Sequence, residues 1–165
     1  MFKKIVLFAL LFVPVSLFAQ DKMAYFNSAE VIPIMPEYAQ MQDSIQKMQV
    51  GFQKEMKDLE DEYSKKYEAF MAEGEKLIES IRVRRMQEIQ DIAQRAESYS
   101  EQFQKELQQT YDVLLQPIQQ KVKDALDKVG AENNFTFIFD GSALVYVGTN
   151  AIDATSLVKK KLGLQ

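Results

Sequence analysis

Apolar residues recur along the middle of the chain in an eleven-residue rhythm, in steps of three or four residues. Eleven residues make about three turns of an α-helix, so these side chains stay on one face of a long helix. The rhythm therefore predicts two long helices, each with an apolar stripe. The first stripe comprises Met41, Ile45, Met48, Phe52, Met56, Leu59, Tyr63, Tyr67 and Phe70, and the second comprises Ile92, Ala96, Tyr99, Phe103, Leu107, Leu114, Ile118 and Val122.

The two stripes fit an arm made of two antiparallel helices, over residues 37–129. The helices are predicted from residue 37 to 80 and from 82 to 129, which places the tip of the arm near 79–82. Each helix of about 45 residues would be about 65 Å long. One uninterrupted helix of about 90 residues is the alternative, since neither a proline nor a strong turn signal marks the tip. We favour the hairpin, because the short strands that flank it need each other.

The first nineteen residues are typical of an export signal. Lys3 and Lys4 precede an apolar run over residues 5–15, and Ala19 supplies a small residue before a cleavage site. An uncleaved membrane anchor is the alternative, but the run is shorter than the roughly 20 residues that a spanning helix needs. We therefore expect residues 1–19 to be a signal peptide that is removed on export.

The composition argues against an enzyme and against a nucleic-acid partner. The chain contains neither His nor Cys, which removes the commonest general base, metal ligand and strong nucleophile. Its formal net charge of −4 becomes −6 when Lys3 and Lys4 leave with the signal peptide, whereas nucleic-acid-binding domains normally carry a basic excess. The glycines form no phosphate-binding loop. We expect no catalytic residue, no cofactor and no metal site.

Short apolar segments at both ends of the mature chain predict a small β-rich body, formed by residues 20–36 and 130–165. One strand is expected at Met23–Phe26. Strands at 135–139 and 143–147 are expected to form a hairpin, with Gly141 at positive φ in its turn, before a last short helix at 154–162. The fold class is thus α+β, mostly α.

So small a body is difficult to stabilise alone, and the apolar stripes of the arm also need partners. Both points favour a homo-oligomer in which the sheets of several copies meet. The copy number does not follow from the composition. The residues expected at this contact are Tyr25, Phe137, Phe139 and Val145.

Three arginines, Arg82, Arg84 and Arg85, cluster near the predicted tip. Such a cluster offers a contact for anionic lipid head groups. Glu79 and Glu88 lie among these arginines, so a solubilising tip is the better interpretation.

Methionine is frequent in the mature chain, and Met41, Met48 and Met56 fall on the first apolar stripe. Flexible methionines suit both plain helix packing and an adaptable surface for unrelated partners, and the sequence does not separate these two uses. Near the tip, Phe70, Met71 and Met86 are candidate contacts for such a partner.

Pro117 lies inside the second predicted helix, where it removes a hydrogen bond and predicts a kink. The kink is either a local irregularity or a hinge between a fixed base and a mobile arm.

The order of these parts resembles the Skp/OmpH family of periplasmic chaperones for outer membrane proteins. Pro117-Ile118 with Gly130 resembles the return of the second helix into the body. The resemblance covers the whole mature chain. Its short motifs are Met23-Ala24-Tyr25-Phe26-Asn27-Ser28, similar to the I-A-x-V-N start of the family; Phe137-Ile138-Phe139-Asp140 and Ala143-Leu144-Val145-Tyr146, similar to its paired strands; and Asp153-Ala154-Thr155, similar to the D-I-T opening of its last helix.

The resemblance implies a periplasmic homotrimer, in which three helical hairpins extend from a central body around a cavity. Unfolded outer membrane proteins would be held there without ATP before membrane insertion. The acidic charge of this chain argues against strong attraction to anionic membranes. A non-enzymatic coiled-coil spacer or adaptor in the cell envelope is the alternative function, and it predicts stiff arms whose stripes are fully buried.

Overall fold

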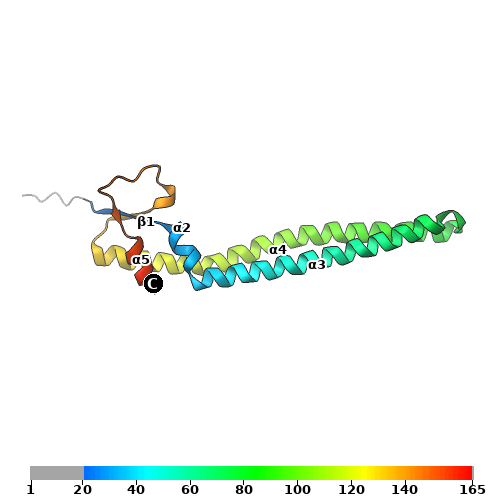
Figure 1. Cartoon of the computed structure of the whole chain (residues 1–165), viewed down its shortest axis with the longest axis horizontal. Coiled ribbons are helices and arrows are strands. Elements are labelled where there is room, and N and C mark those ends of the chain that lie inside the picture. Colours follow the sequence, from blue (N-terminus) through cyan, green and yellow to red (C-terminus); the bar gives the residue numbers. More distant parts are fainter. Residues whose placement is uncertain (1–20, 165) are drawn as a thin grey trace, which may run out of the picture.

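The computed structural model describes residues 21–164, so the expected signal peptide lies outside the described residues. A small body lies at one end of the molecule, and an arm of two helices projects from it (Figure 1). The arm consists of α3 (Pro36–Glu73) and α4 (Glu79–Asn133). The body contains β1 (Met23–Phe26), α2 (Ser28–Val31), β2 (Phe137–Asp140), β3 (Ile152–Asp153) and α5 (Thr155–Lys161). The expectation of a mostly helical α+β chain with a small three-stranded sheet is confirmed.

The two helices of the arm run in opposite directions and pack along their apolar stripes. Near the body, Lys121 of α4 forms an ion pair with Glu37 of α3. In the middle of the arm, the ring of Phe52 stacks on that of Phe103, with centroids 4.1 Å apart. Further out, Arg95 binds Glu62 at 2.9 Å. The apolar stripe therefore forms a seam between the helices, while charged residues of both signs line its edges.

The chain reverses at residues 74–78, a few positions before the expected tip at 79–82. A 3₁₀ turn at Gly74–Lys76 follows α3, and Leu77 and Ile78 are then extended, with ψ of 140° and 148°. Two consecutive extended residues end the helical hydrogen bonding and redirect the chain. Neither proline nor positive φ is used at this reversal, which is why the sequence pattern did not locate it.

The three strands form a parallel sheet in the order β2-β1-β3. The expected antiparallel hairpin of strands 135–139 and 143–147 is therefore wrong: β2 pairs with β1, and residues 143–147 form no strand. β2 and β3 lie on opposite sides of β1 and run in the same direction as β1. The connection from the end of β2 to the start of β3 must therefore cross back over one face of the sheet. Residues 141–151 provide that connection, seen as the orange loop beside the body in Figure 1.

Gly141 also differs from its expected conformation, because its φ is not positive. It opens a 3₁₀ turn at Gly141–Ala143. A Cβ atom at this position would lie 3.0 Å from Cδ2 of Tyr25 and 3.3 Å from the carbonyl oxygen of Phe26. The close approach of the turn to β1 therefore favours glycine, because a larger residue would displace the ring of Tyr25 or the backbone of β1.

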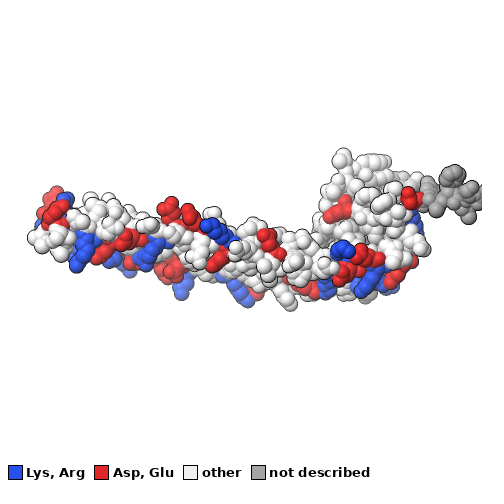
Figure 2. Space-filling view, turned by 180° about the vertical axis from the view of Figure 1, so that it is seen from behind, with Lys and Arg blue, Asp and Glu red and all other residues white. Residues whose placement is uncertain are grey.

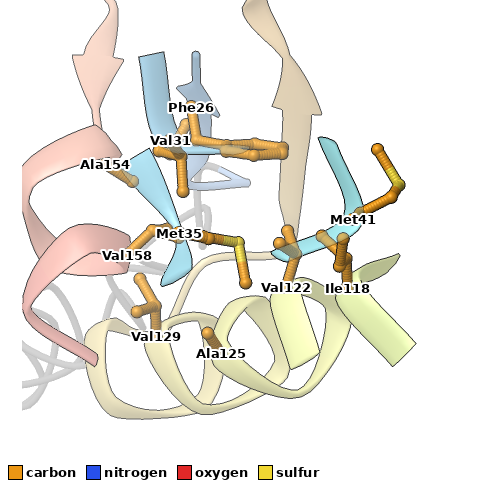
Figure 3. Close-up of a cluster of buried hydrophobic side chains, with 11 residues drawn as sticks. Phe26, Val31, Met35, Met41, Ile118, Val122, Ala125, Val129, Ala154 and Val158 are labelled. Carbon is orange, nitrogen blue, oxygen red and sulfur yellow. The ribbon is translucent and has the colours of Figure 1, made fainter. Parts of the chain in front are cut away.

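The core of the body lies between the sheet and the last turns of α4 (Figure 3). Ile118, Val122, Ala125 and Val129 recur along α4 in steps of three or four, so they form one buried face of the helix. The base of the arm is therefore part of the body's core. The buried residues that complete this core are Ala24, Phe26, Val31, Met35, Met41, Ala154 and Val158.

Polar contacts tie the two ends of the chain together beside this core. The side chain of Asn27 accepts a hydrogen bond from the N–H of Ala29 and so caps α2. Its amide group donates to Glu30, while its backbone N–H donates to the hydroxyl oxygen of Thr155 at 3.0 Å. The carboxylate of Asp153 accepts the N–H of Thr155 at 2.8 Å. Thr155 thus connects β1 with the start of α5.

The carboxylates of Asp140 and Asp153 make the stability of the body depend on pH. Burial alone would raise the pKa of each carboxyl, but hydrogen bonds from Ser28 and Ser142 to Asp140, and from Thr155 and Tyr25 to Asp153, lower both pKa values. A carboxyl whose pKa is lower in the folded than in the unfolded chain stabilises the fold at pH values above its unfolded pKa of 3.8. This stabilisation is lost as the pH falls through the pKa of the folded state.

We therefore expect the thermal midpoint to fall as the pH is lowered below about 4, and to fall less steeply in an Asp140→Asn/Asp153→Asn variant. Circular dichroism melting curves over a pH series would measure both slopes. Equal acid slopes for the parent and the variant would contradict this assignment.

Candidate functional site

The face of the sheet that points away from the core carries aromatic side chains. Tyr25 is in register with Phe139, and Phe137 precedes Phe139 by two residues, so the three lie on one face. Phe137 and Phe139 are 50% and 44% exposed, and their ring centroids lie 6.0 Å apart. The fold thus brings together three of the four residues that the sequence predicts at a contact between copies.

The fourth residue, Val145, lies outside the sheet in the connection between β2 and β3. It is fully exposed, and its neighbour Tyr146 is 83% exposed. Tyr146 nevertheless lines a hollow together with Tyr25 and Phe139. The connection and the outer sheet face therefore form one apolar surface. We call it the body surface, and it comprises Tyr25, Phe137, Phe139, Val145 and Tyr146.

The tip of the arm exposes a second group of apolar side chains. Phe70 is half-buried and lines a hollow with Met71 and Leu77, and Met71 is 64% exposed. Met86 lines a neighbouring hollow and is 42% exposed. The three predicted contact residues therefore lie near the reversal, on both helices of the arm.

Ile78 and Val83 belong to the same group and are 70% and 58% exposed, but the sequence pattern did not predict them. Both fall outside the regular apolar stripes, so the helical rhythm did not select them. The signal in the sequence was that an apolar residue off a stripe has no helix to pack against. We call Met71, Leu77, Ile78, Val83 and Met86 the apolar tip.

The arginines near the tip form ion pairs with neighbouring glutamates. Arg82 binds Glu79 at 2.7 Å, Arg84 approaches Glu88 at 3.7 Å, and Arg85 approaches Glu73 at 3.5 Å. Residues 70–90 carry four basic and four acidic side chains, so their charges cancel. Figure 2 shows the same interleaving of both signs along the arm. The arginines thus offer no local excess of positive charge to an anionic lipid surface.

One ion pair near the tip also links the two helices. Nζ of Lys66 lies 2.8 Å from a carboxylate oxygen of Glu88. This hydrogen bond, the charge of Lys66 and a smaller contribution from Arg84 lower the pKa of Glu88. Exposed pairs of this kind contribute little energy, so they set the register of the helices more than their stability.

Pro117 lies at the border between the body and the free part of the arm. It is exposed, while the next residue, Ile118, is fully buried in the core. Helix α4 continues through this position. Because proline has no N–H, the carbonyl of Val113 lacks its helical partner there.

Within residues 21–164, no cluster of three or more acidic side chains is arranged to hold a metal ion. None of the helices described in this range has both the length and the apolar character needed to cross a membrane.

The comparison with family models identifies one family. The model of the family described as outer membrane protein (OmpH-like) matches residues 22–162. The fold is similar to the crystal structure of a candidate outer membrane chaperone (OmpH-like) from Caulobacter crescentus, with a TM-score of 0.74 and 15% sequence identity. The match covers 87% of this chain and 85% of the other. A search of curated proteins found no match.

Proposed function

The chain belongs to the OmpH-like (Skp/OmpH) family, and from this premise we propose that it is an ATP-independent holdase chaperone of the periplasm. It would bind unfolded outer membrane proteins in a cavity between helical arms and prevent their aggregation before membrane insertion. Residues 1–19 would direct export and would be removed on export. The similar fold of a candidate outer membrane chaperone supports this assignment.

The observation that carries the proposal is the apolar tip, which lies far along the arm from the body's core (Figure 1). A soluble protein rarely exposes apolar side chains together unless they bind something. The tip includes flexible methionines, which adapt to many partners. Contacts of this kind suit clients that share exposed apolar segments but no common sequence.

Holding a whole unfolded client requires more than one arm, and we propose that three copies supply three arms. The copies would meet through the body surface, so that residues 20–36 and 130–165 form the association body and residues 37–129 form the arm. The exposure of Phe137, Phe139 and Val145 in the single chain supports this arrangement. Burying such side chains between copies would stabilise a body that is small by itself.

We also propose that Pro117 is a hinge at the base of the arm. Pro117→Ala would restore the missing hydrogen bond to Val113 and stiffen α4, so we expect weaker holding of large clients than of small ones. Aggregation assays with a large and a small outer membrane barrel would measure this difference. Equal holding of large clients by the variant and the parent would refute the hinge.

Light scattering of a denatured outer membrane barrel, diluted into buffer with the purified mature protein, tests the proposed function. We expect aggregation to be suppressed at one oligomer per client, with the mass of the oligomer measured in the same buffer. A folded water-soluble enzyme of similar mass provides the control for non-specific crowding. Unchanged aggregation beside a stable oligomer would contradict the holdase and favour the spacer.

A further inference from the structure

We propose that Met71 and Met86 form a redox-sensitive element at the tip of the arm. Oxidation of their thioethers to sulfoxides by a peroxide would make the apolar tip polar and weaken client binding. The effect on clients rests on the proposed holdase function. The site of oxidation rests only on the composition and on the exposure of the methionines.

Composition concentrates oxidation on methionine in this chain. There is no Cys, no Trp and no His among its 165 residues. The thioethers are therefore its only sulfur groups, and methionine sulfoxide is a common and reversible product of oxidation. An oxidant that reaches the folded protein has no thiol to react with first.

In the folded chain the methionines differ widely in how far their side chains are exposed to solvent. Met35 and Met41 are each 1% exposed in the core of the body, whereas Met71 and Met86 are 64% and 42% exposed. Met48 and Met56, in the seam of the arm, are intermediate. Oxidation of folded proteins follows exposure, so the tip should react while the core is protected.

Met23 is the remaining exposed methionine of the mature chain, at 51%. It begins β1 and lines the hollow at the body surface. In the proposed assembly this surface is covered by another copy. Met23 should therefore react more slowly in the assembled protein than its exposure in one chain suggests.

The chemical step is balanced with hydrogen peroxide as the oxidant. A lone pair of the methionine sulfur attacks one peroxide oxygen, an S–O bond forms and the O–O bond breaks. The sulfur is oxidised by two electrons, the peroxide is reduced, and its second oxygen leaves as water with the proton from the transferred hydroxyl. Sulfoxide reductases reverse the change, with one enzyme for each sulfoxide epimer.

The surroundings of the two sulfurs explain why the change would matter. Met71 and Met86 line neighbouring hollows that share the Glu79–Arg82 ion pair as a common border. A sulfoxide oxygen accepts hydrogen bonds strongly, and Arg82 is a donor on the lining of both hollows. Oxidation would thus replace two apolar contacts by polar groups that water and Arg82 solvate.

The experiment treats the full mature protein with graded hydrogen peroxide and measures sulfoxide at each methionine by peptide mass spectrometry. We expect Met71 and Met86 to oxidise about tenfold faster than Met35 and Met41. At the dose that oxidises most of the tip, we expect the capacity to suppress client aggregation to fall about threefold or more. Treatment with both classes of sulfoxide reductase should restore it.

Met71→Leu/Met86→Leu is the matched control, because leucine keeps the apolar volume and has no sulfur to oxidise. Its capacity to hold clients, whatever the value before treatment, should not fall after peroxide. If peroxide lowered the client-holding capacity of this control as much as that of the parent, the proposal would be overturned. Uniform oxidation of all methionines, or full client capacity after the tip is oxidised, would overturn it too. Failure of the untreated parent to hold clients would instead refute the proposed function, with the tip-first oxidation judged separately by mass spectrometry.

Discussion

Replacing Ile118 by alanine should lower the free energy of unfolding by about 2–5 kcal/mol. Ile118 is 0% exposed and lies beside Met41 and Val122, where α3 and α4 enter the body (Figure 3). Truncation would leave a cavity at this junction, which the surrounding side chains cannot close without moving both helices. Since a domain of this size is stable by about 5–15 kcal/mol, the loss would be a large part of the total.

Val113→Ala provides the matched control, because Val113 lies on the same helix five residues earlier and is 67% exposed. Its truncation should change the free energy by no more than about 0.5 kcal/mol. Urea unfolding followed by circular dichroism, at one fixed protein concentration, would compare the variants, because association adds to apparent stability. Similar losses for the two variants would show that the junction is not the core of the body.

Val145→Asp should reduce the mass of the protein in solution to about one third, if three copies meet at the body surface as proposed. Val145 is fully exposed in the single chain, so the change costs the fold of one copy almost nothing. In the assembly, each copy would bring an unpaired carboxylate into an apolar contact. Burying such a charge is strongly unfavourable.

Val50→Asp makes the same substitution at a 59% exposed position on α3, away from the body surface. It should leave the mass unchanged. Light scattering coupled to size-exclusion chromatography would give both masses, and circular dichroism would check that the helices remain. An unchanged mass for Val145→Asp would move the contact elsewhere, and a monomeric parent would refute the trimer.

The Ile118 and Val145 substitutions depend on which apolar residues are buried and which are exposed. The sequence predicts the buried residues better than the exposed ones. The helical rhythm places Met41 and Ile118 on the apolar stripes, and both are buried. The first stripe also ends at Phe70 near the tip, where Met71 and Met86 were predicted as contacts because they are methionines and not because of the rhythm. The rhythm overlooks Ile78 and Val83, because a rhythm identifies residues that face a partner helix and not residues left without one.

For the strands, the local sequence pattern led to a wrong prediction of their pairing. Residues 143–147 have the composition of a strand and follow a turn, so a local interpretation pairs them with 135–139. In the structure, β1 lies between β2 and β3, whose residues are more than a hundred positions away along the chain. No local pattern states whether a short apolar segment takes a distant parallel partner or a near antiparallel one.

The sequence by itself determined the two long helices with their apolar stripes and the membership of the family. These features depend on residues three or four positions apart, or on short contiguous motifs, which the sequence contains directly. Only the tertiary structure decided the parallel order of the sheet, the reversal at 74–78 and the exposure of Ile78, Val83 and Val145. Those features depend on which distant segments compete for the same edge or the same apolar face. That competition is settled by the packing of the whole chain.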